Sequence, residues 1–292
     1  MISAESSPNE HRAASDNRPS QQKTPSMDIR EAGLADHVGH ARDSALDRMQ
    51  YRILKWISPE DPPYMSGEPY KDKIKVKVLL GNAVFNQLRG KVVIDFGCGD
   101  GDDAIALARN GALRVIGIDI REPLLQQART KARRQGVEKV CLFCTHTDEK
   151  ADAIVSLDSF EHFTDPASVL MKMYELLNRE GAVFASFGPT WYHPLGGHLF
   201  SVFPWAHLIF SEKALIRWRS DLRHDGATRF GEVEGGLNQM TISRFKKIVN
   251  QSPFVLKSLE AVPIRRLRLL HSRLTREFTS SVVRCKLVKS RC

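Results

Sequence analysis

The chain has 292 residues, with 43 Lys and Arg against 34 Asp and Glu, which gives a formal net charge of +9. At 42% hydrophobic and 26% charged residues, its composition excludes collagen, coiled coils and disorder throughout. No run approaches the roughly 20 apolar residues of a membrane-spanning helix, and the N-terminus lacks the apolar core of a secretory signal. Five cysteines, an odd count, do not form a disulfide scaffold, so we expect a cytoplasmic protein.

The positive charge is concentrated toward the C-terminus. Residues 261–292 hold nine basic residues and one acidic residue, a net charge of +8. Such a block attracts nucleic acid or an anionic membrane surface, but it also blunts an exposed sheet edge. Base-stacking aromatics are not interleaved with the arginines, which favours the sheet-edge interpretation over nucleic acid as a partner. Peripheral contact with a membrane surface is a further alternative for this block.

The N-terminal 90 residues divide into two parts. Residues 1–27 are rich in Ser, Asn, Gln and Pro, which predicts a disordered tail. Residues 28–90 predict a helical segment, because apolar residues recur at helical spacing and a second helix covers Ile74–Leu88. The helical stripe consists of Leu34, Val38, Ala41, Ala45, Met49 and Ile53.

From Gly90 onward, short apolar runs alternate with helices, which predicts a parallel sheet with helices on both faces. Residues 188–239 interrupt this alternation, hold three of the four Trp and predict a cap inserted after the fifth strand. We therefore expect one domain over 91–292. The expected strands are Val92–Phe96, Arg114–Ile118, Val140–Cys144, Ala153–Leu157, Ala182–Phe187, Phe254–Val262 and Ser281–Val288, and the expected helices are Asp102–Arg109, Glu122–Gln135, Ser168–Leu177 and Thr241–Val249.

A glycine-rich loop, DFGCGDG at 95–101, joins the first of these strands to a helix. Glycines let the backbone approach a ligand closely, and the helix N-terminus presents free N–H groups. A dinucleotide fingerprint needs a third glycine where Asp102 stands. Asp102 and Asp103 would repel a pyrophosphate but not a ligand that carries an ammonium group. The second strand ends in Asp119, whose carboxylate can accept hydrogen bonds from both ribose hydroxyls.

The chain resembles the class I S-adenosylmethionine-dependent methyltransferases in four motifs. These are DFGCGDG at 95–101, GID at 117–119, DAIVSLDSFEHF at 152–163 and LLNREGAVFASF at 176–187. The resemblance implies an α/β, three-layer, doubly wound Rossmann-like fold. Its seven-stranded sheet has the order 3-2-1-4-5-7-6, with an antiparallel last strand. The resemblance also implies S-adenosylmethionine as cofactor and methyl transfer as activity.

By position, the resemblance assigns contacts with the cofactor. The three glycines of the loop line its methionine part, Asp95 helps hold its ammonium end, and Asp119 holds its ribose. Ile120 packs on the adenine, Asp148 is a candidate partner for the adenine amino group, and Asp158 shapes the pocket. A ligand-free turn, a helix cap at Asp119 and a turn residue at Asp148 are the alternatives. The complete set is Asp95, Gly97, Cys98, Gly99, Gly101, Asp119, Ile120, Asp148 and Asp158.

Three histidines are candidates for a catalytic base: His162 follows the fourth strand, and His193 and His198 follow the fifth. The carboxyl ends of these strands lie beside the glycine loop, and imidazole titrates near neutral pH. Helix capping or loop packing is the alternative for each. Trp191 and Tyr192, in the same segment, are candidates to bind the acceptor.

The leading functional hypothesis is methyl transfer to oxygen or nitrogen of a small-molecule or glycan-like acceptor, because an aromatic cap suits an enclosed acceptor. One alternative is an RNA methyltransferase that docks through the basic C-terminal block. Another is a non-catalytic protein that binds S-adenosylmethionine. The apolar run Leu199–Phe210 is too short to span a bilayer; it lines the acceptor pocket, dips into a membrane surface or forms a buried lid helix.

Two further motifs are interpreted as structural. The DPPY at 61–64 matches a motif of adenine amino-methyltransferases, but it precedes the glycine loop, which favours a proline turn. Cys141 and Cys144 lie three residues apart within an expected strand, so their side chains point to opposite faces. No metal site is expected.

Overall fold

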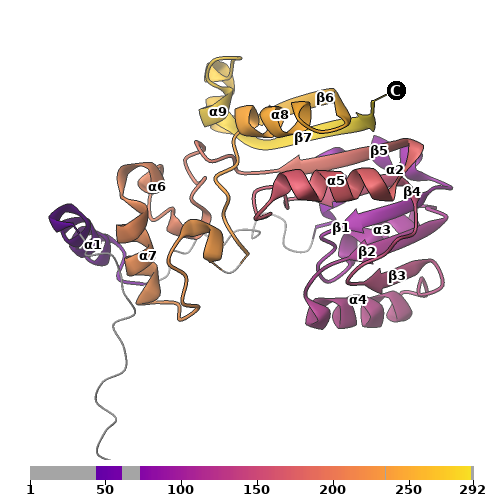
Figure 1. Cartoon of the computed structure of the whole chain (residues 1–292), viewed down its shortest axis with the longest axis horizontal. Helices are drawn as coiled ribbons and strands as arrows, with labels where there is room; N and C mark the ends of the chain where they lie inside the picture. The colour runs from indigo at the N-terminus through magenta and orange to yellow at the C-terminus, as the bar shows by residue number, and fades with distance from the viewer. Residues whose placement is uncertain (1–43, 61–72, 234, 291–292) are drawn as a thin grey trace, which may run out of the picture. The chain divides into compact units, whose positions relative to one another are not determined.

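The structure is a computed structural model that describes residues 44–60, 73–233 and 235–290. Seven strands of the described chain form one sheet in the order β3-β2-β1-β4-β5-β7-β6 (Figure 1). The first five are parallel, and β7 is antiparallel to its neighbours β5 and β6. The predicted strand order and antiparallel last strand are confirmed. The strands are β1 (Val92–Phe96), β2 (Arg114–Ile118), β3 (Cys141–Cys144), β4 (Ala151–Leu157), β5 (Leu177–Phe187), β6 (Phe254–Pro263) and β7 (Ser280–Lys289).

Helices cover both faces of this sheet, because successive strand residues point to opposite faces. Val93 packs into the core on one face, and its neighbour Ile94 packs into the core on the other. The first face is covered by η2 (Val76–Leu80), α2 (Ala83–Leu88), α3 (Asp102–Arg109) and α4 (Glu122–Arg134), and the second by α5 (Pro166–Leu176) and α8 (Ile242–Asn250). Two apolar cores on either side of one sheet give the predicted three-layer architecture.

The prediction of a single helix over Ile74–Leu88 is wrong, because the segment forms two helical elements. The chain forms a π-helical turn, η2, and then the separate helix α2. Gly81 lies between them with φ of 81°, a left-handed conformation that glycine adopts readily and that ends a helix.

The boundary between α5 and β5 also differs from the prediction, in which residues 178–181 separated the helix Ser168–Leu177 from the strand Ala182–Phe187. The strand begins at Leu177, directly after the helix. Leu177 pairs with Ala151 across an irregularity in the β4–β5 register, and the Asn178 amide donates to Asp152 at 2.9 Å. Pairing with β4 therefore overrides the turn preference of these residues.

The segment between β5 and α8 builds a third apolar core, shared with the first described helix. That helix, α1 (Ala45–Ile57), lies beside α7 in Figure 1. The Ser211 hydroxyl donates to Asp47 at 2.6 Å, and the Trp218 indole donates to the Ser58 carbonyl at 2.7 Å. Leu54 is fully buried in this core. The segment contains η3 (His198–Phe200), α6 (Ala206–Ile209), α7 (Glu212–Ser220) and η4 (Phe230–Glu232).

The described members of the predicted helical stripe lie in α1, but on an exposed face of it. Ala45, Met49 and Ile53 are exposed, whereas Leu54 is buried. Apolar residues occupy more than one face of α1, and α7 packs against the face that carries Leu54. The other stripe residues, the predicted tail and the DPPY motif lie outside the described residues.

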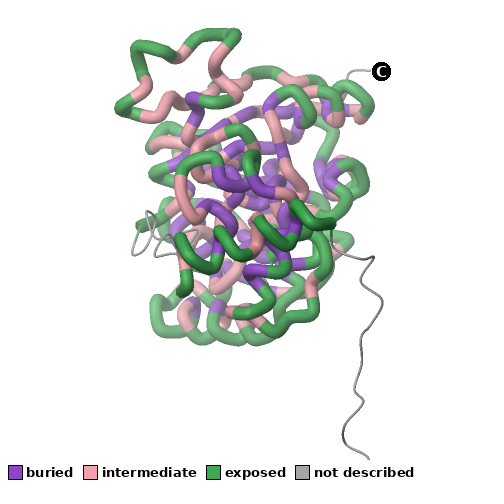
Figure 2. The backbone as a smooth tube through the Cα atoms, turned by 90° about the vertical axis from the view of Figure 1, so that its left-hand side faces the viewer, coloured by how far each residue is buried: buried purple, intermediate pink, exposed green. Residues whose placement is uncertain are grey.

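Between β6 and β7 the chain projects from the sheet as η5 (Arg265–Leu270) and α9 (Arg276–Thr279). This segment forms the exposed and half-buried loop at the top of Figure 2, whereas buried residues concentrate in the interior. Among the described residues, no helix is long and apolar enough to cross a membrane.

Candidate functional site

The glycine loop connects the carboxyl end of β1 to α3. Gly97, Gly99 and Gly101 have φ of 85°, 53° and 84°. The N–H groups of Gly97 and Cys98 donate to the Ile118 carbonyl at 2.8 and 2.9 Å, which fastens the loop to the end of β2. The loop therefore lies at the edge where parallel strands end, the usual position of ligands in open α/β sheets.

Gly101 and Gly99 have different surroundings. A Cβ on Gly101 would lie 2.6 Å from the Ala128 Cβ and 2.9 Å from the Phe143 ring, so this glycine allows α3, α4 and β3 to pack closely. A Cβ on Gly99 would have no protein atom within 4 Å. Gly99 therefore borders open space beside the loop, where a ligand can approach the backbone.

Asp119 follows β2 and is 6% exposed. Its Oδ2 accepts the Gly99 N–H at 2.9 Å, and its Oδ1 accepts the Arg121 N–H at 2.9 Å. The Arg121 guanidinium contacts both oxygens, at 3.0 and 3.1 Å. Burial acts to raise the pKa of Asp119, but hydrogen bonds from Arg121 and Gly99 outweigh it and hold the pKa below its ordinary value. Asp119 is thus an ionised acceptor beside the loop.

Two further carboxyls lie at the ends of the central strands. Asp95, in β1, is 3% exposed, and its Oδ2 has no partner among the described residues. Burial, together with the charge of Asp103, raises the pKa of Asp95. Asp158 follows β4 with φ of 46°, and its Oδ2 lies 3.4 Å from the Lys75 ammonium. Burial raises the pKa of Asp158.

Glu161 is a buried acid next to this group, 2% exposed. Its Oε1 accepts the Gly188 N–H at 2.9 Å, so it ties the end of β4 to the end of β5. Burial, and then the neighbouring Asp158, raises the pKa of Glu161 to about 8.

Of the three candidate histidines, His162 has the geometry of a base. Its Nδ1 lies 2.9 Å from the Gly236 carbonyl. Because a carbonyl can only accept, Nδ1 carries the proton, which leaves the lone pair on Nε2. The ring of His198 packs 5.3 Å from that of His162.

His193 and His198, both in the cap, are held in their uncharged form. Burial and neighbouring histidines lower the pKa of His198 to about 3, and burial with His207 lowers the pKa of His193 to about 4. The His193 Nδ1 already accepts the Leu195 N–H at 2.9 Å. These two rings are therefore much weaker bases than an ordinary imidazole.

Comparisons with known proteins identify this fold. Residues 94–185 match a family model described as "Methyltransferase domain". The ubiquinone biosynthesis O-methyltransferase of Neisseria meningitidis serogroup C is 36% identical over 106 residues, which are 34% of this chain and 44% of the relative. The ribosomal protein L11 methyltransferase of Photobacterium profundum is 48% identical over 73 residues, 24% of this chain and 25% of the relative.

The crystal structure of magnesium protoporphyrin IX methyltransferase from Synechocystis PCC 6803 with bound SAH shows the same fold. It has a TM-score of 0.50 at 18% identity, over 84% of this chain and 96% of that one. Residues 94–185 thus match a methyltransferase domain, and the sheet around them has the fold of a methyltransferase. It spans less than half the length of the curated relatives named here.

The residues of the methyltransferase domain fit S-adenosylmethionine. The partnerless Oδ2 of Asp95 suits an ammonium donor, and Asp119 suits ribose hydroxyls. The open side of Gly99 admits a close ligand. Ile120, directly after Asp119, is 90% exposed, which leaves its side chain available to an adenine ring. The structure therefore places the glycine loop, Asp95, Asp119 and Ile120 at the same edge of the sheet.

Other predicted cofactor residues lie differently in the domain. Cys98 is buried, and burial raises the pKa of its thiol, so it contributes packing and its backbone rather than a reactive sulfur. The Asp148 side chain is 93% exposed and lies 3.7 Å from Lys172 on α5. No hydrogen bond or ion pair among the described residues links Asp148 to the loop.

The two aromatic candidates take part in packing. Trp191 lies in the core of the cap, where its ring is 4.7 Å from His207 and 5.5 Å from Phe230. Tyr192 is 37% exposed and stacks on Phe278 at 5.1 Å. Both therefore shape the cap, and Tyr192 presents part of its ring to solvent.

Three residues of the site were missed by sequence reasoning. Lys75 precedes the sheet and pairs with Asp158, a contact between distant parts of the chain that no local pattern indicates. Arg121 is a basic residue two positions after Asp119, and Glu161 stands with His162 between two phenylalanines in the SFEHF run. An acid in such an apolar setting is the one signal that was available.

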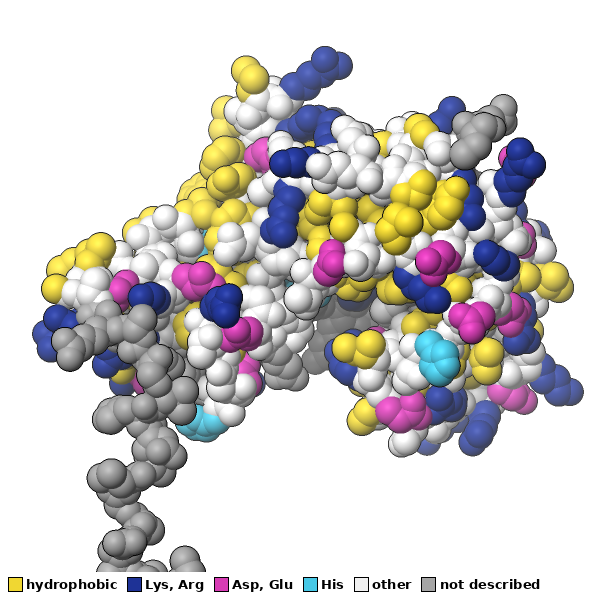
Figure 3. All heavy atoms as spheres, in the orientation of Figure 1, with side chains coloured by type: hydrophobic (Ala, Val, Ile, Leu, Met, Phe, Trp, Pro, Cys, Tyr) yellow, Lys and Arg dark blue, Asp and Glu magenta, His cyan; other side chains and the backbone are white. Residues whose placement is uncertain are grey.

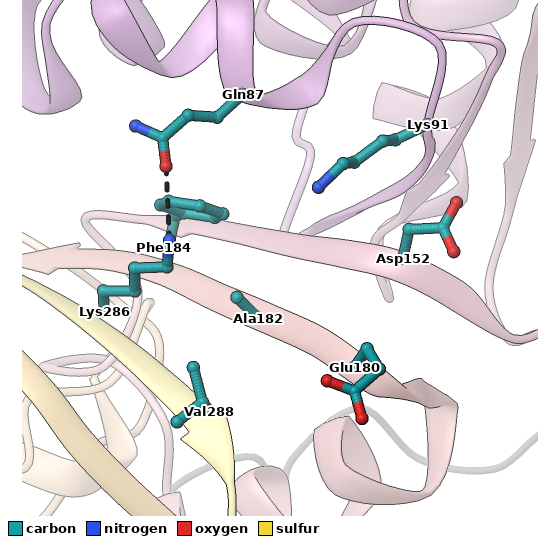
Figure 4. Close-up of a pocket in the computed structure, with 8 residues that line it drawn as sticks. All are labelled: Gln87, Lys91, Asp152, Glu180, Ala182, Phe184, Lys286 and Val288. Carbon is teal, nitrogen blue, oxygen red and sulfur yellow. Dashed lines mark hydrogen bonds between the residues drawn. The ribbon is translucent and has the colours of Figure 1, made fainter.

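A pocket of about 230 Å³ lies elsewhere on the domain (Figure 4). It is lined by residues at the starts of the strands, such as Lys91 and Asp152, and the Lys286 ammonium donates to Gln87 across it at 3.2 Å. It opens at the amino ends of β1 and β4, whereas the glycine loop lies at the carboxyl ends. This pocket is therefore separate from the cofactor site. Among the described residues, no group of three or more acids, histidines or cysteines is arranged to hold a metal ion.

Proposed function

We propose that this chain transfers the methyl group of S-adenosylmethionine to an oxygen or nitrogen of a small-molecule or glycan-like acceptor. The observation that supports it most is Asp119 holding Gly99 at the mouth of the glycine loop. One relative is named for ubiquinone biosynthesis and the other for a ribosomal protein, so the relatives leave the acceptor open.

The proposed reaction needs little covalent chemistry from the protein. S-adenosylmethionine, when bound, supplies an activated methyl group. Asp95 and Asp119 would fix the position of the cofactor, and the cap would exclude water from the acceptor. His162 would take the proton that a hydroxyl or ammonium acceptor loses, because its Nε2 carries the lone pair.

In this proposal the methyltransferase domain covers residues 91–292 with the cap inserted at 188–239, and residues 28–90 precede it. Because α1 shares an apolar core with α7, the two helical parts of residues 28–90 have different roles. The preceding helix supports the cap, whereas η2 and α2 support the sheet.

Replacing Asp119 by Ala is expected to weaken binding of S-adenosylmethionine by about 1–3 kcal/mol, the usual cost of stranding hydrogen-bonded partners. Asp119→Asn separates the contribution of the negative charge from that of the hydrogen bond to Gly99, because its amide oxygen can still accept the Gly99 N–H. Calorimetric titration with S-adenosylmethionine, with NAD as the control ligand, measures the effect. Asp102→Ala is the matched control, since this exposed acid pairs with Lys131 at 2.7 Å. Unchanged affinity in both Asp119 variants would remove the ribose assignment.

Loss of the His162 imidazole is expected to lower kcat about 10²–10⁴-fold for a hydroxyl or ammonium acceptor, the typical contribution of a general base. The measurement is release of the demethylated cofactor in the presence of a panel of phenols, sugars and amines. Binding of S-adenosylmethionine should not change in His162→Ala. The exposed His146 provides the control variant, His146→Ala. Equal turnover in His162→Ala and the wild type would leave methyl transfer in place but remove the base.

A further inference from the structure

The segment between β6 and β7, residues 264–279, is an exposed basic and apolar projection that we call the basic arch. Its sequence, IRRLRLLHSRLTREFT, holds five arginines and one acid, Glu277. Figure 3 shows blue and yellow side chains side by side at the top of the molecule, above the position of α9 in Figure 1. Nothing in the proposed reaction uses this segment.

Three of the four leucines of the basic arch are exposed to solvent. Leu269 is 101% exposed, Leu274 is 92% exposed and Leu270 is 63% exposed. Burial of a leucine side chain is favourable, so three exposed leucines in sixteen residues leave considerable apolar surface uncovered. Contiguous exposed apolar surface usually marks a binding site.

The exposed charged side chains of the basic arch are all positive. Arg265, Arg266, Arg268 and Arg273 are exposed. The single acid, Glu277, is turned toward α8, where it accepts the N–H groups of Ile242 and Ser243 at 2.9 and 2.8 Å. The outward surface of the arch is therefore cationic as well as apolar.

The arch is a built element rather than a loose connection. The Ile264 N–H donates to the Thr279 carbonyl at 2.8 Å and closes its base, and His271 lies 2.8 Å from the Thr279 hydroxyl. The Thr190 hydroxyl donates to the Glu277 carbonyl at 3.1 Å. The arch is thus fastened to the start of the segment that follows β5.

Further exposed apolar residues continue from the arch onto the cap. Tyr192 stacks on Phe278 of the arch, and the Trp205 indole donates to the Tyr192 carbonyl at 3.0 Å. Trp205 is 37% exposed and Ile209, on α6, is 59% exposed. Aromatic and aliphatic side chains next to arginines are the composition of segments that lie in a membrane interface.

We propose that the basic arch docks this protein on an anionic lipid surface, with its leucines in the acyl boundary and its arginines against the headgroups. Anionic headgroups complement the exposed arginines, because the negative surface potential of such a membrane attracts basic side chains that lie near it. RNA would match the charge but would leave the leucines in water, and the aromatic of the arch, Phe278, already stacks on Tyr192. A second copy of the chain, related by two-fold symmetry, would bring arginines against arginines.

The test is sedimentation of the full chain with vesicles of phosphatidylglycerol and phosphatidylcholine, compared with vesicles of phosphatidylcholine alone. The expected result is binding to the anionic vesicles that weakens as salt is added. The double variant Leu269→Ser, Leu274→Ser should lower the partition coefficient roughly tenfold or more. The double variant Arg266→Gln, Arg268→Gln should lower it by a similar factor. Methyl transfer is not needed for this measurement, so its result stands apart from the proposed reaction.

Two controls match these substitutions on other surfaces. Leu113, 66% exposed, provides Leu113→Ser, and the exposed arginines of α4 provide the double variant Arg133→Gln, Arg134→Gln. Neither should change vesicle binding. The proposal is overturned by no binding to anionic vesicles at low salt, or by equal losses in arch and control variants. It is also overturned if the arch variants instead abolish binding to polyuridine RNA or self-association in analytical ultracentrifugation.

Discussion

As the pH rises from about 4.5 to about 8, the protein is expected to lose stability through Glu161, and Glu161→Gln is expected to lose less. The ordinary pKa of a glutamate is 4.5, whereas burial and Asp158 raise the pKa of Glu161 to about 8 in the folded chain. Between these values the folded state binds a proton that the unfolded state lacks. Stability therefore falls with pH across this window, by at most about 1.4 kcal/mol per pH unit for one proton.

The substitution keeps most of the contacts of Glu161. A glutamine carbonyl can accept the Gly188 N–H in place of Oε1, and its amide nitrogen replaces Oε2, which has no partner among the described residues. Because an amide does not titrate in this range, only the pH dependence should change. Burial also raises the pKa of Asp95 and Asp158, so part of the slope remains in the variant.

Urea unfolding at a series of pH values measures this difference. The free energy of unfolding of Glu161→Gln should fall less steeply than that of the wild type, so the two curves should lie close together near pH 4.5 and separate toward pH 8. The exposed Glu180 gives the control variant Glu180→Gln, which should follow the wild type. Parallel curves for Glu161→Gln and the wild type would show that Glu161 is ionised in the folded protein.

The parts of the site that were predictable from the sequence are those that a local pattern encodes. The spacing of Gly97, Gly99 and Gly101 after a buried strand predicted a ligand loop, and the acid at the end of the next strand predicted Asp119. Both predictions rest on adjacent parallel strands ending at the same edge, a property of the fold class rather than of this chain.

The parts that were not predictable depend on contacts between distant residues. Lys75 reaches Asp158 from before the sheet, and α7 decides which face of α1 is buried. Two of the histidines proposed as bases were chosen for their position, but burial lowers the pKa of His193 and His198. Sequence places a titratable group near a site; its burial, which sets its pKa, follows only from packing.

The glycine loop offers a matched pair of substitutions, one expected to lower the stability of the fold and the other to lower the affinity for S-adenosylmethionine. Gly101→Ala should destabilise the fold by about 2–4 kcal/mol, because it combines a left-handed backbone with overpacking. Its φ is 84°, and its Cβ would lie 2.6 Å from that of Ala128 and 2.9 Å from the Phe143 ring. For a chain of this size each kcal/mol lowers Tm by roughly 2–4 °C, so thermal unfolding measures the loss directly.

Gly99→Ala should instead weaken the binding of S-adenosylmethionine, and it should lower Tm less than Gly101→Ala does. Its φ of 53° lies in the small left-handed region that other residues reach at a cost of about 1–2 kcal/mol, and its Cβ would meet no protein atom within 4 Å. The added methyl group would occupy space that the proposed cofactor needs for close approach to the loop. A loss of affinity confined to Gly99→Ala would support the assignment of that space to the ligand. Wild-type affinity in Gly99→Ala would place the ligand elsewhere, and a Tm for Gly101→Ala equal to that of the wild type would contradict the close packing of α3, α4 and β3.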